Sequence, residues 1–248
     1  MSNRYKLTIE YDGSPYCGFQ KQSEKHVKSI AEILEKAIFN LTKEEVKISV
    51  CGRTDAGVHA LGQVIHFDLK KEFNAFKMIA GLNHFLKNEL IAVLDCEKLD
   101  EKFHARISAK MRKYRYIIIN RRGNLTIDRN HAYLVVAKLD VTLMQVAAQF
   151  LIGKHDFSSF RDSQCQAKSP IRTIKSIEIW QEREKIFLEI SAKSFLHHMV
   201  RNIVGTLILV GKKKIKPDEV KNILEAKNRL KSGPNAPSCG LYFVSCTY

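Results

Sequence analysis

The first residues of the chain alternate between apolar and polar side chains, and this pattern restricts the fold most. Within residues 4–11 the apolar side chains occupy every second position, at Tyr5, Leu7, Ile9 and Tyr11. Successive side chains of a strand point to opposite faces, so this segment is predicted to be a half-buried strand. Asp, Gly, Ser and Pro follow at 12–15 and predict a turn.

A helical pattern begins directly after a capping signature. Ser29 and Glu32 are spaced as in a capping box, and apolar residues then repeat at helical spacing as far as Leu41. Apolar runs further along predict strands at 46–51, 63–69 and 90–96, and a helix from about 74 to 86. The first hundred residues therefore intersperse strands and helices.

The same mixture begins again after residue 109, which indicates two related halves. We predict strands near 114–119, 172–180, 186–192 and 240–248, and helices over 140–152, 195–210 and from Pro217 onward. This order of elements favours an α+β fold with a largely antiparallel sheet over a doubly wound parallel sheet. We place the boundary between the two halves so that they comprise residues 1–108 and 109–248.

The chain carries a large excess of positive charge. It has 41 Lys and Arg residues against 26 Asp and Glu residues, a formal net charge of +15. Such a field favours polyanions, either nucleic acid or an anionic membrane surface. Polar residues interrupt every apolar stretch well short of the ~20 residues that a spanning helix needs. The N-terminus lacks the pattern of a signal peptide, so we expect a cytoplasmic protein.

The positive charge is concentrated in two regions. Residues 101–130 contain nine basic and two acidic side chains, and no acid occurs between Ser191 and Pro217. Two such regions suit a phosphate-lined partner larger than a mononucleotide. For the lysines at 212–216, a solvated surface is the alternative interpretation.

Within the first basic region, residues 110–116 combine arginine, lysine and tyrosine. On a strand, alternation places Arg112, Tyr114 and Tyr116 on one face and Lys113 and Arg115 on the other. Tyrosine beside arginine on an extended strand is typical of a platform that stacks bases and contacts phosphates. Ordinary packing within a sheet is the alternative.

Signatures of metal, nucleotide and disulfide chemistry are absent from the sequence. Six cysteines are scattered without a C-x-x-C pair, which predicts reduced, structural thiols. Gly13 and Gly18 have the spacing of a phosphate-binding loop, but the Lys-Ser/Thr that must follow is missing. His197 and His198 are adjacent on a predicted helix and so are poor co-ligands for a metal ion.

The segment with the most chemistry is the loop at 52–60, which reads Gly-Arg-Thr-Asp-Ala-Gly-Val-His-Ala. Glycines let a backbone approach a ligand closely, and Arg53 or another guanidinium would keep Asp55 ionised and nucleophilic. The alternative is a turn in which Asp55 bonds its own backbone.

These motifs together resemble the tRNA pseudouridine synthase A (TruA) family. The match to its catalytic loop runs from Cys51 to Gln63. Blocks that resemble other family motifs occur in family order over almost the whole chain, at 11–20, 113–116, 156–160, 195–205 and 236–242. Phe19 stands where the family usually has tryptophan.

The resemblance implies two ferredoxin-like subdomains with a shared, mainly antiparallel sheet and a basic central cleft. It implies a homodimer that acts on tRNA and isomerises uridine to pseudouridine at positions 38, 39 and 40 of the anticodon arm, without cofactor or metal. Asp55 would be the nucleophile, Arg53 or Arg201 would pair with it, and Tyr114 would stack on the target base. We assign substrate contacts to Tyr114, Thr54, His59, Arg112, Arg115, His197 and Leu241.

A non-catalytic RNA-binding or chaperone module is the alternative from another functional class. The residue that distinguishes the two hypotheses is Asp55. An anionic side chain in a surface that binds a polyanion opposes binding, so its presence favours chemistry.

Overall fold

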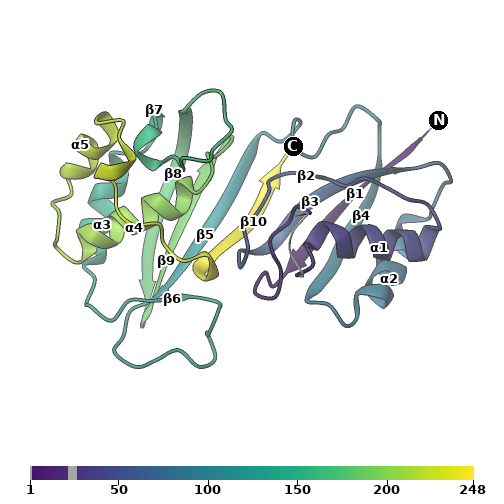
Figure 1. Cartoon of the computed structure of the whole chain (residues 1–248), viewed down its shortest axis with the longest axis horizontal. Helices are drawn as coiled ribbons and strands as arrows, with labels where there is room; N and C mark the ends of the chain where they lie inside the picture. The colour runs from purple at the N-terminus through teal and green to yellow at the C-terminus, as the bar shows by residue number, and fades with distance from the viewer. Residues whose placement is uncertain (1, 22–26) are drawn as a thin grey trace. The chain divides into compact units, whose positions relative to one another are not determined.

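A computed structural model describes residues 2–21 and 27–248. The chain forms two compact units, of which the first comprises Met1–Lys110 with Tyr242–Tyr248 and the second Met111–Leu241 (Figure 1). Each unit combines helices with mostly antiparallel strands, which confirms the α+β class and the largely antiparallel pairing. The division at residue 108 into ferredoxin-like subdomains stays a prediction.

The first unit consists of a sheet and two helices. Strand β1 (Asn3–Tyr11) pairs antiparallel with β3 (His59–Leu69) and with β4 (Ile91–Leu99). The short β2 (Ser49–Val50) pairs antiparallel with β3, and β10 (Leu241–Thr247) pairs parallel with it. Helices α1 (Ile30–Thr42) and α2 (Ala75–Leu86) lie side by side against this sheet (Figure 1).

Local sequence patterns at the start of the chain predicted β1 and α1 correctly. Tyr5, Leu7 and Ile9 of β1 are fully buried, as the alternation requires. The capping box is present: the Ser29 side chain accepts the Glu32 N–H, and the Glu32 carboxylate accepts the Ser29 N–H at 2.8 Å. These reciprocal bonds satisfy donors that a helix N-terminus otherwise leaves unpaired.

The second unit is built around an antiparallel sheet. Strand β5 (Met111–Ile119) pairs with β9 (Lys185–Ala192), β9 with β8 (Ile171–Glu182), and β8 with β7 (Gly153–Asp156), while β6 (Tyr133–Leu134) is parallel to β5. The helices are α3 (Val141–Gln149), α4 (Met199–Gly211) and α5 (Glu219–Glu225), with 3-10 turns η1 (Ser158–Phe160), η2 (Arg229–Lys231) and η3 (Ser238–Gly240). None of the helices within the described ranges has the length and apolarity to span a membrane.

Among the boundaries that differ from the sequence prediction, two are set by long-range contacts. The helix predicted from residue 195 begins only at Met199, since His198 has a left-handed backbone with φ of +58°. The strand predicted from 63 begins at His59 because Tyr242 and Phe243, from the end of the chain, pair with its first residues. The local sequence pattern shows neither the left-handed backbone at His198 nor the pairing with Tyr242 and Phe243.

His66 is a buried histidine of β3 that the fold keeps neutral. Its Nδ1 accepts the backbone N–H of Ala105 at 3.1 Å. Burial lowers the pKa of His66 to about 4, and the positive charge of Arg4 acts in the same direction. The folded state therefore resists protonation of this ring.

Replacing His66 is predicted to flatten the pH dependence of stability. Between pH 6.5 and pH 4 the unfolded chain binds a proton at residue 66 that the folded chain does not, so the free energy of unfolding falls as the pH decreases. His66→Asn keeps an acceptor for Ala105 and removes the titration. Urea denaturation across this range will show a smaller loss of stability in the variant, and parallel curves for the two proteins would contradict the prediction.

Candidate active site

Hydrogen bonds to β1, to Phe19 in the turn that follows it, and to β3 hold the loop at 52–58 in place. Phe19 donates its N–H to the carbonyl of Thr54 at 3.0 Å, and the hydroxyls of Tyr11 and Thr54 are bonded at 2.7 Å. On the other side, the Gln63 amide donates to the carbonyl of Gly52 at 2.7 Å. Asp55 is thus carried by a fixed loop, and its side chain is partly exposed, whereas Thr54 is buried.

The turn after β1 packs directly on this loop, backbone against backbone. A Cβ atom on Gly13 would lie 2.0 Å from the carbonyl oxygen of Val58. Gly18 has φ of +107°, and a Cβ there would lie 2.9 Å from the carbonyl oxygen of Thr54. Glycine is required at both positions because no side chain fits between the two segments.

Gly13→Ala is predicted to displace the loop that carries Asp55. The clash involves backbone atoms that cannot rotate away, so we expect a loss of about 1–3 kcal/mol of stability. The control is Gly123→Ala, whose nearest atom would be the Arg121 Nε at 3.8 Å, an ordinary contact. Thermal denaturation measures stability, and amide hydrogen exchange measures the order of residues 52–58. Equal behaviour of the two variants would refute the prediction.

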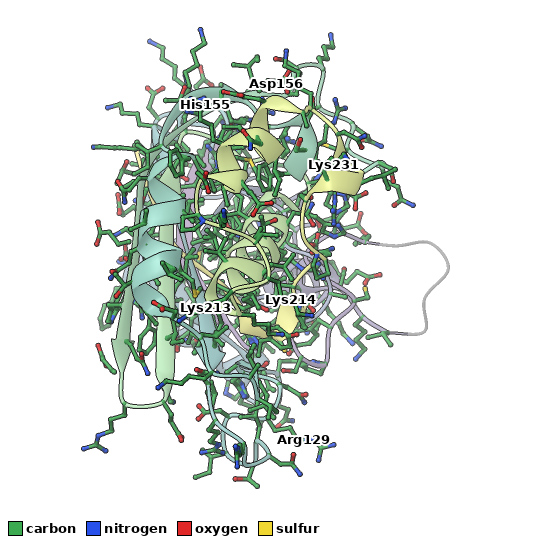
Figure 2. The ribbon with its side chains drawn as sticks, turned by 90° about the vertical axis from the view of Figure 1, so that its left-hand side faces the viewer. Arg129, His155, Asp156, Lys213, Lys214 and Lys231 are labelled. Carbon is green, nitrogen blue, oxygen red and sulfur yellow. The ribbon has the colours of Figure 1, made fainter. Side chains whose placement is uncertain are left out.

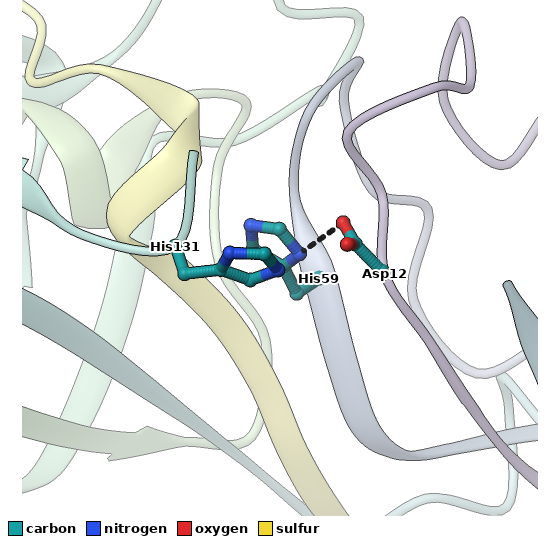
Figure 3. Close-up of side chains that lie close together, drawn as sticks. All are labelled: Asp12, His59 and His131. Carbon is teal, nitrogen blue, oxygen red and sulfur yellow. Dashed lines mark ion pairs between the residues drawn. The ribbon is translucent and has the colours of Figure 1, made fainter. Parts of the chain in front are cut away.

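His59 begins β3 at the end of the loop and is only 1% exposed. Its Nδ1 lies 3.1 Å from the backbone nitrogen of Gly13 and 3.1 Å from the Asp12 carboxylate, as Figure 3 shows for the pair with Asp12. The ring also stacks on Tyr242 with centroids 4.6 Å apart. One nitrogen cannot both accept from Gly13 and donate to Asp12, so protonation would exchange the first bond for the second.

Strand β5 shows the predicted alternation of faces. Arg112, Tyr114 and Tyr116 are buried, whereas Lys113 and Arg115 lie on the opposite, partly exposed face. The Tyr114 ring is 8% exposed and meets Phe195 edge-on, with centroids 5.2 Å apart. The Arg112 guanidinium donates to the carbonyl of Lys193.

The two tyrosines of this face differ in their surroundings. Tyr116 is fully buried, and its hydroxyl donates to the carbonyl of Pro237 at 2.7 Å. Burial raises the pKa of Tyr116. A Cβ on Gly240 would lie 2.7 Å from the Tyr116 ring, so the segment that leads into Leu241 packs closely on it. Tyr116 therefore has a structural role.

Ion pairs on and near the opposite face of β5 offset part of the positive charge counted for residues 101–130. Arg115 binds the Glu189 carboxylate at 2.6 Å and lies over the rings of Trp180 and Phe187, 5.9 Å from each centroid. Lys113 also pairs with Glu189, and Arg121 pairs with Glu184. Strand pairing thus supplies carboxylates from outside residues 101–130, so part of the local positive charge is compensated. The predicted substrate contact of Arg115 stays a prediction.

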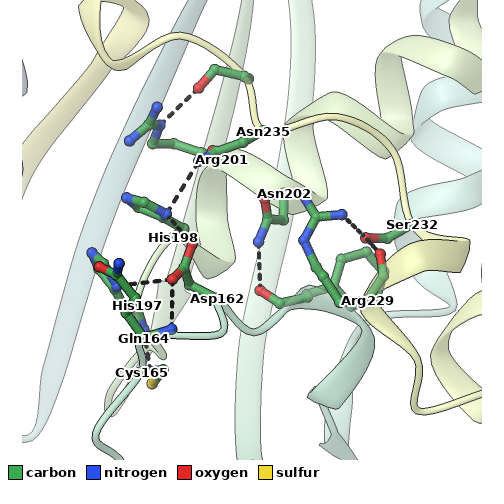
Figure 4. Close-up of polar contacts among 12 residues, drawn as sticks. Asp162, Gln164, Cys165, His197, His198, Arg201, Asn202, Arg229, Ser232 and Asn235 are labelled. Atoms are coloured by element: carbon green, nitrogen blue, oxygen red, sulfur yellow. Dashed lines mark hydrogen bonds and ion pairs between the residues drawn. The ribbon is translucent and has the colours of Figure 1, made fainter.

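A polar network surrounds the start of α4 (Figure 4). Asp162 lies with Oδ2 2.7 Å from the Nδ1 of His198 and with Oδ1 3.6 Å from the Nδ1 of His197. Gln164 donates its N–H to Asp162 at 2.8 Å. Burial by itself would raise the pKa of Asp162, but the Gln164 bond and the two histidines together lower it below its usual range.

Arg201 lies in the first turn of α4 and is held by a segment that crosses the helix. Its Nε donates to the carbonyl of Ala236 at 2.7 Å, and the Ala236 N–H donates back to the carbonyl of Arg201 at 3.2 Å. A Cβ on Gly205 would lie 1.7 Å from the Pro234 carbonyl oxygen. The crossing segment therefore fixes the guanidinium through backbone contacts.

The lysines beyond the other end of α4 have a structural explanation as well. Lys213 and Lys214 follow the last turn of the helix (Figure 2), and Lys213 pairs with Asp140 at 3.3 Å. Cations near a helix C-terminus are stabilised by the helix dipole.

Sequence reasoning missed Asp162 and Asn235, which contact His198, because neither belongs to a motif that signals chemistry.

Comparison with known proteins supplies the family. The family model described as tRNA pseudouridine synthase matches residues 7–106 and 147–248. The tRNA pseudouridine synthase A of Ehrlichia chaffeensis is 51% identical over 99% of this chain and 100% of its own length. The enzyme of that name from Ehrlichia canis is 52% identical over the same shares, and that from Ehrlichia ruminantium is 51% identical over 99% of each chain. The chain belongs to the tRNA pseudouridine synthase family.

Among solved structures, the crystal structure of a Cbf5-Nop10-Gar1 complex contains a chain that aligns with a TM-score of 0.34 and 11% identity. The alignment covers 82% of this chain and 45% of that one. The score is too low to establish a shared fold.

Proposed function

We propose that this chain isomerises uridine to pseudouridine at positions 38, 39 and 40 of the tRNA anticodon arm, with Asp55 as the nucleophile. The observation that carries the proposal is the loop Gly-Arg-Thr-Asp-Ala-Gly-Val-His at 52–59, in a chain 51–52% identical to tRNA pseudouridine synthases A over essentially its full length. The anchored backbone of the loop supports it further.

The reaction breaks the bond from C1′ to N1 and forms a bond from C1′ to C5. The proton leaves C5 and N1 gains one, so atoms and electrons balance without an oxidant or a second substrate. A carboxylate that attacks the nucleoside and later leaves can divide this exchange into two easier steps. A fixed loop suits this role, since a displacement of about 1 Å can cost about 10²-fold in rate.

An arginine would keep Asp55 ionised. Arg53 lies two residues away and is exposed, and Arg201 is held at the start of α4, so both are candidates for this pairing. Tyr114 would stack on the target base, since its ring is held edge-on by Phe195 and its strand is rich in arginine. Thr54, His59, Arg112, Arg115, His197 and Leu241 complete the proposed substrate contacts.

The finer features that the family resemblance implies belong to the same proposal. They are two ferredoxin-like subdomains with a shared sheet and a basic cleft, a homodimer, and a cytoplasmic location. The net charge of +15 supports a polyanionic substrate. Sedimentation of the purified protein tests the dimer directly.

Asp55→Asn is predicted to bind tRNA and to have no turnover. The substitution removes the nucleophile, whereas the loss of a negative charge does not weaken binding to a polyanion. Tritium released from tRNA labelled at uridine C5 measures turnover, and filter binding measures affinity. The control is Asp95→Asn, an exposed carboxylate on β4. Activity of Asp55→Asn within about tenfold of the wild type would exclude Asp55 as the nucleophile.

Tyr114→Phe is predicted to bind tRNA normally and to stall after the glycosidic bond has broken, because a phenol can move a proton at C5 and a phenyl ring cannot. Tyr114→Ala would in addition lose base stacking worth about 1–3 kcal/mol. Single-turnover assays that separate bond cleavage from tritium release measure the two steps.

The control for Tyr114 is Tyr116→Phe, which removes the bond to Pro237 and is expected to lower stability by about 1 kcal/mol without changing turnover. Wild-type turnover in Tyr114→Ala would remove Tyr114 from the site.

A further inference from the structure

We propose that Asp162 is a positioning residue for this reaction, which holds the start of α4 through His198 and thereby orients Arg201. The inference rests on the proposed function, because Arg201 matters only if the chain performs the isomerisation. It concerns a residue outside the motifs that suggested the function.

The backbone at His198 needs an external restraint. Its φ of +58° and ψ of 4° are left-handed, a conformation that costs a non-glycine residue roughly 1–2 kcal/mol. Residues 195–198 continue the helical pattern of α4 in the sequence, yet the helix begins only at Met199. A tertiary contact must therefore stop the helix from extending by a turn.

Asp162 supplies this contact at two points. Its carboxylate lies 2.7 Å from the Nδ1 of His198, and its N–H donates to the carbonyl of His197 at 3.2 Å. Asp162 is itself fixed, since its carboxylate accepts the Gln164 N–H and its carbonyl accepts the N–H of Cys165 at 3.1 Å. Side chain and backbone together can hold the left-handed residue.

A second tether lies one turn further along α4. The Asn202 amide is buried and donates to the carbonyl of Phe160 at 2.9 Å, while its oxygen accepts from Arg229 at 2.9 Å (Figure 4). Residues 198 and 202 are thus both bound to the segment at 160–162. Arg201 lies between the two tethers, so both determine where its backbone stands relative to the crossing segment that holds its guanidinium.

The charge of Asp162 agrees with a positioning role. A carboxylate on a surface that binds RNA opposes binding, so affinity does not explain its presence. Its ionised form is the better acceptor for the Nδ1–H of His198, because charge-assisted hydrogen bonds are stronger than neutral ones. Removal of this charge should therefore change the chemical step and not the affinity for tRNA.

Asp162→Asn tests the proposal, with Asp156→Asn as the matched control. Asp156 lies just before η1, and like Asp162 it accepts the N–H two residues ahead, from Ser158 at 2.9 Å (Figure 2). Both carboxyl groups also have a lowered pKa, although burial opposes the shift in each. The two substitutions therefore remove the same charge and weaken a similar local bond, but of the two aspartates only Asp162 contacts His198.

We expect the single-turnover rate at saturating tRNA to fall by about tenfold or more in Asp162→Asn, while the tRNA dissociation constant stays within about twofold or decreases. Asp156→Asn should keep both quantities within about twofold of the wild type. A wild-type rate in Asp162→Asn, or a rate loss that saturating tRNA restores, would overturn the proposal.

The ¹⁵N signals of the His198 ring provide a test that needs no activity. We expect the proton on Nδ1 in the wild type and a loss of this preference in Asp162→Asn; His198→Gln identifies the signals. A wild-type ring without a proton on Nδ1 would overturn the proposal even if the variant failed to fold. If the wild-type protein released no tritium from tRNA, the proposed function would fail, and the ring signals would still decide whether Asp162 holds His198.

Discussion

The contact between the turn after β1 and the loop before β3 is the constraint on which the site depends. The backbone of Gly13 and that of Val58 are so close that a single methyl group has no space between them. Protein interiors are packed too densely to absorb such an insertion without movement. The position of Asp55 is therefore determined by main-chain atoms of two segments, which vary less in position than long side chains do.

The second unit has the same kind of close backbone contact around α4. Gly205 permits the backbone at Pro234 to cross the helix, and Ala236 exchanges two hydrogen bonds with Arg201. A guanidinium whose Nε donates to a neutral carbonyl keeps its positive charge. The crossing segment thus reduces the number of orientations of Arg201 without neutralising its charge.

How far the sequence predicts this structure depends on the range of the contacts. The alternation of β1 and the capping box of α1 are local patterns, and both are present as predicted. The start of α4 was wrong by four residues, because His198 is held by Asp162, 36 positions earlier in the chain. The loop around Asp55 was recognisable through its glycines, whereas the need for glycine at 13 and 18 became evident only from the packing.

The carboxylates of this strongly basic chain also differ in the groups that surround them. Glu189 is bound by Arg115 and Lys113 across a strand pair, so its pKa falls despite burial and its charge is offset locally. Asp162 accepts the Gln164 N–H and lies beside two histidine rings, and its pKa falls as well despite burial. The ion pairs of Glu189 add little to the repulsion of a polyanion, because the field of a close ion pair decays faster than that of a single charge. Carboxylates can therefore fix the positions of neighbouring side chains on a basic surface. Their role there is to set geometry more than to change the net charge.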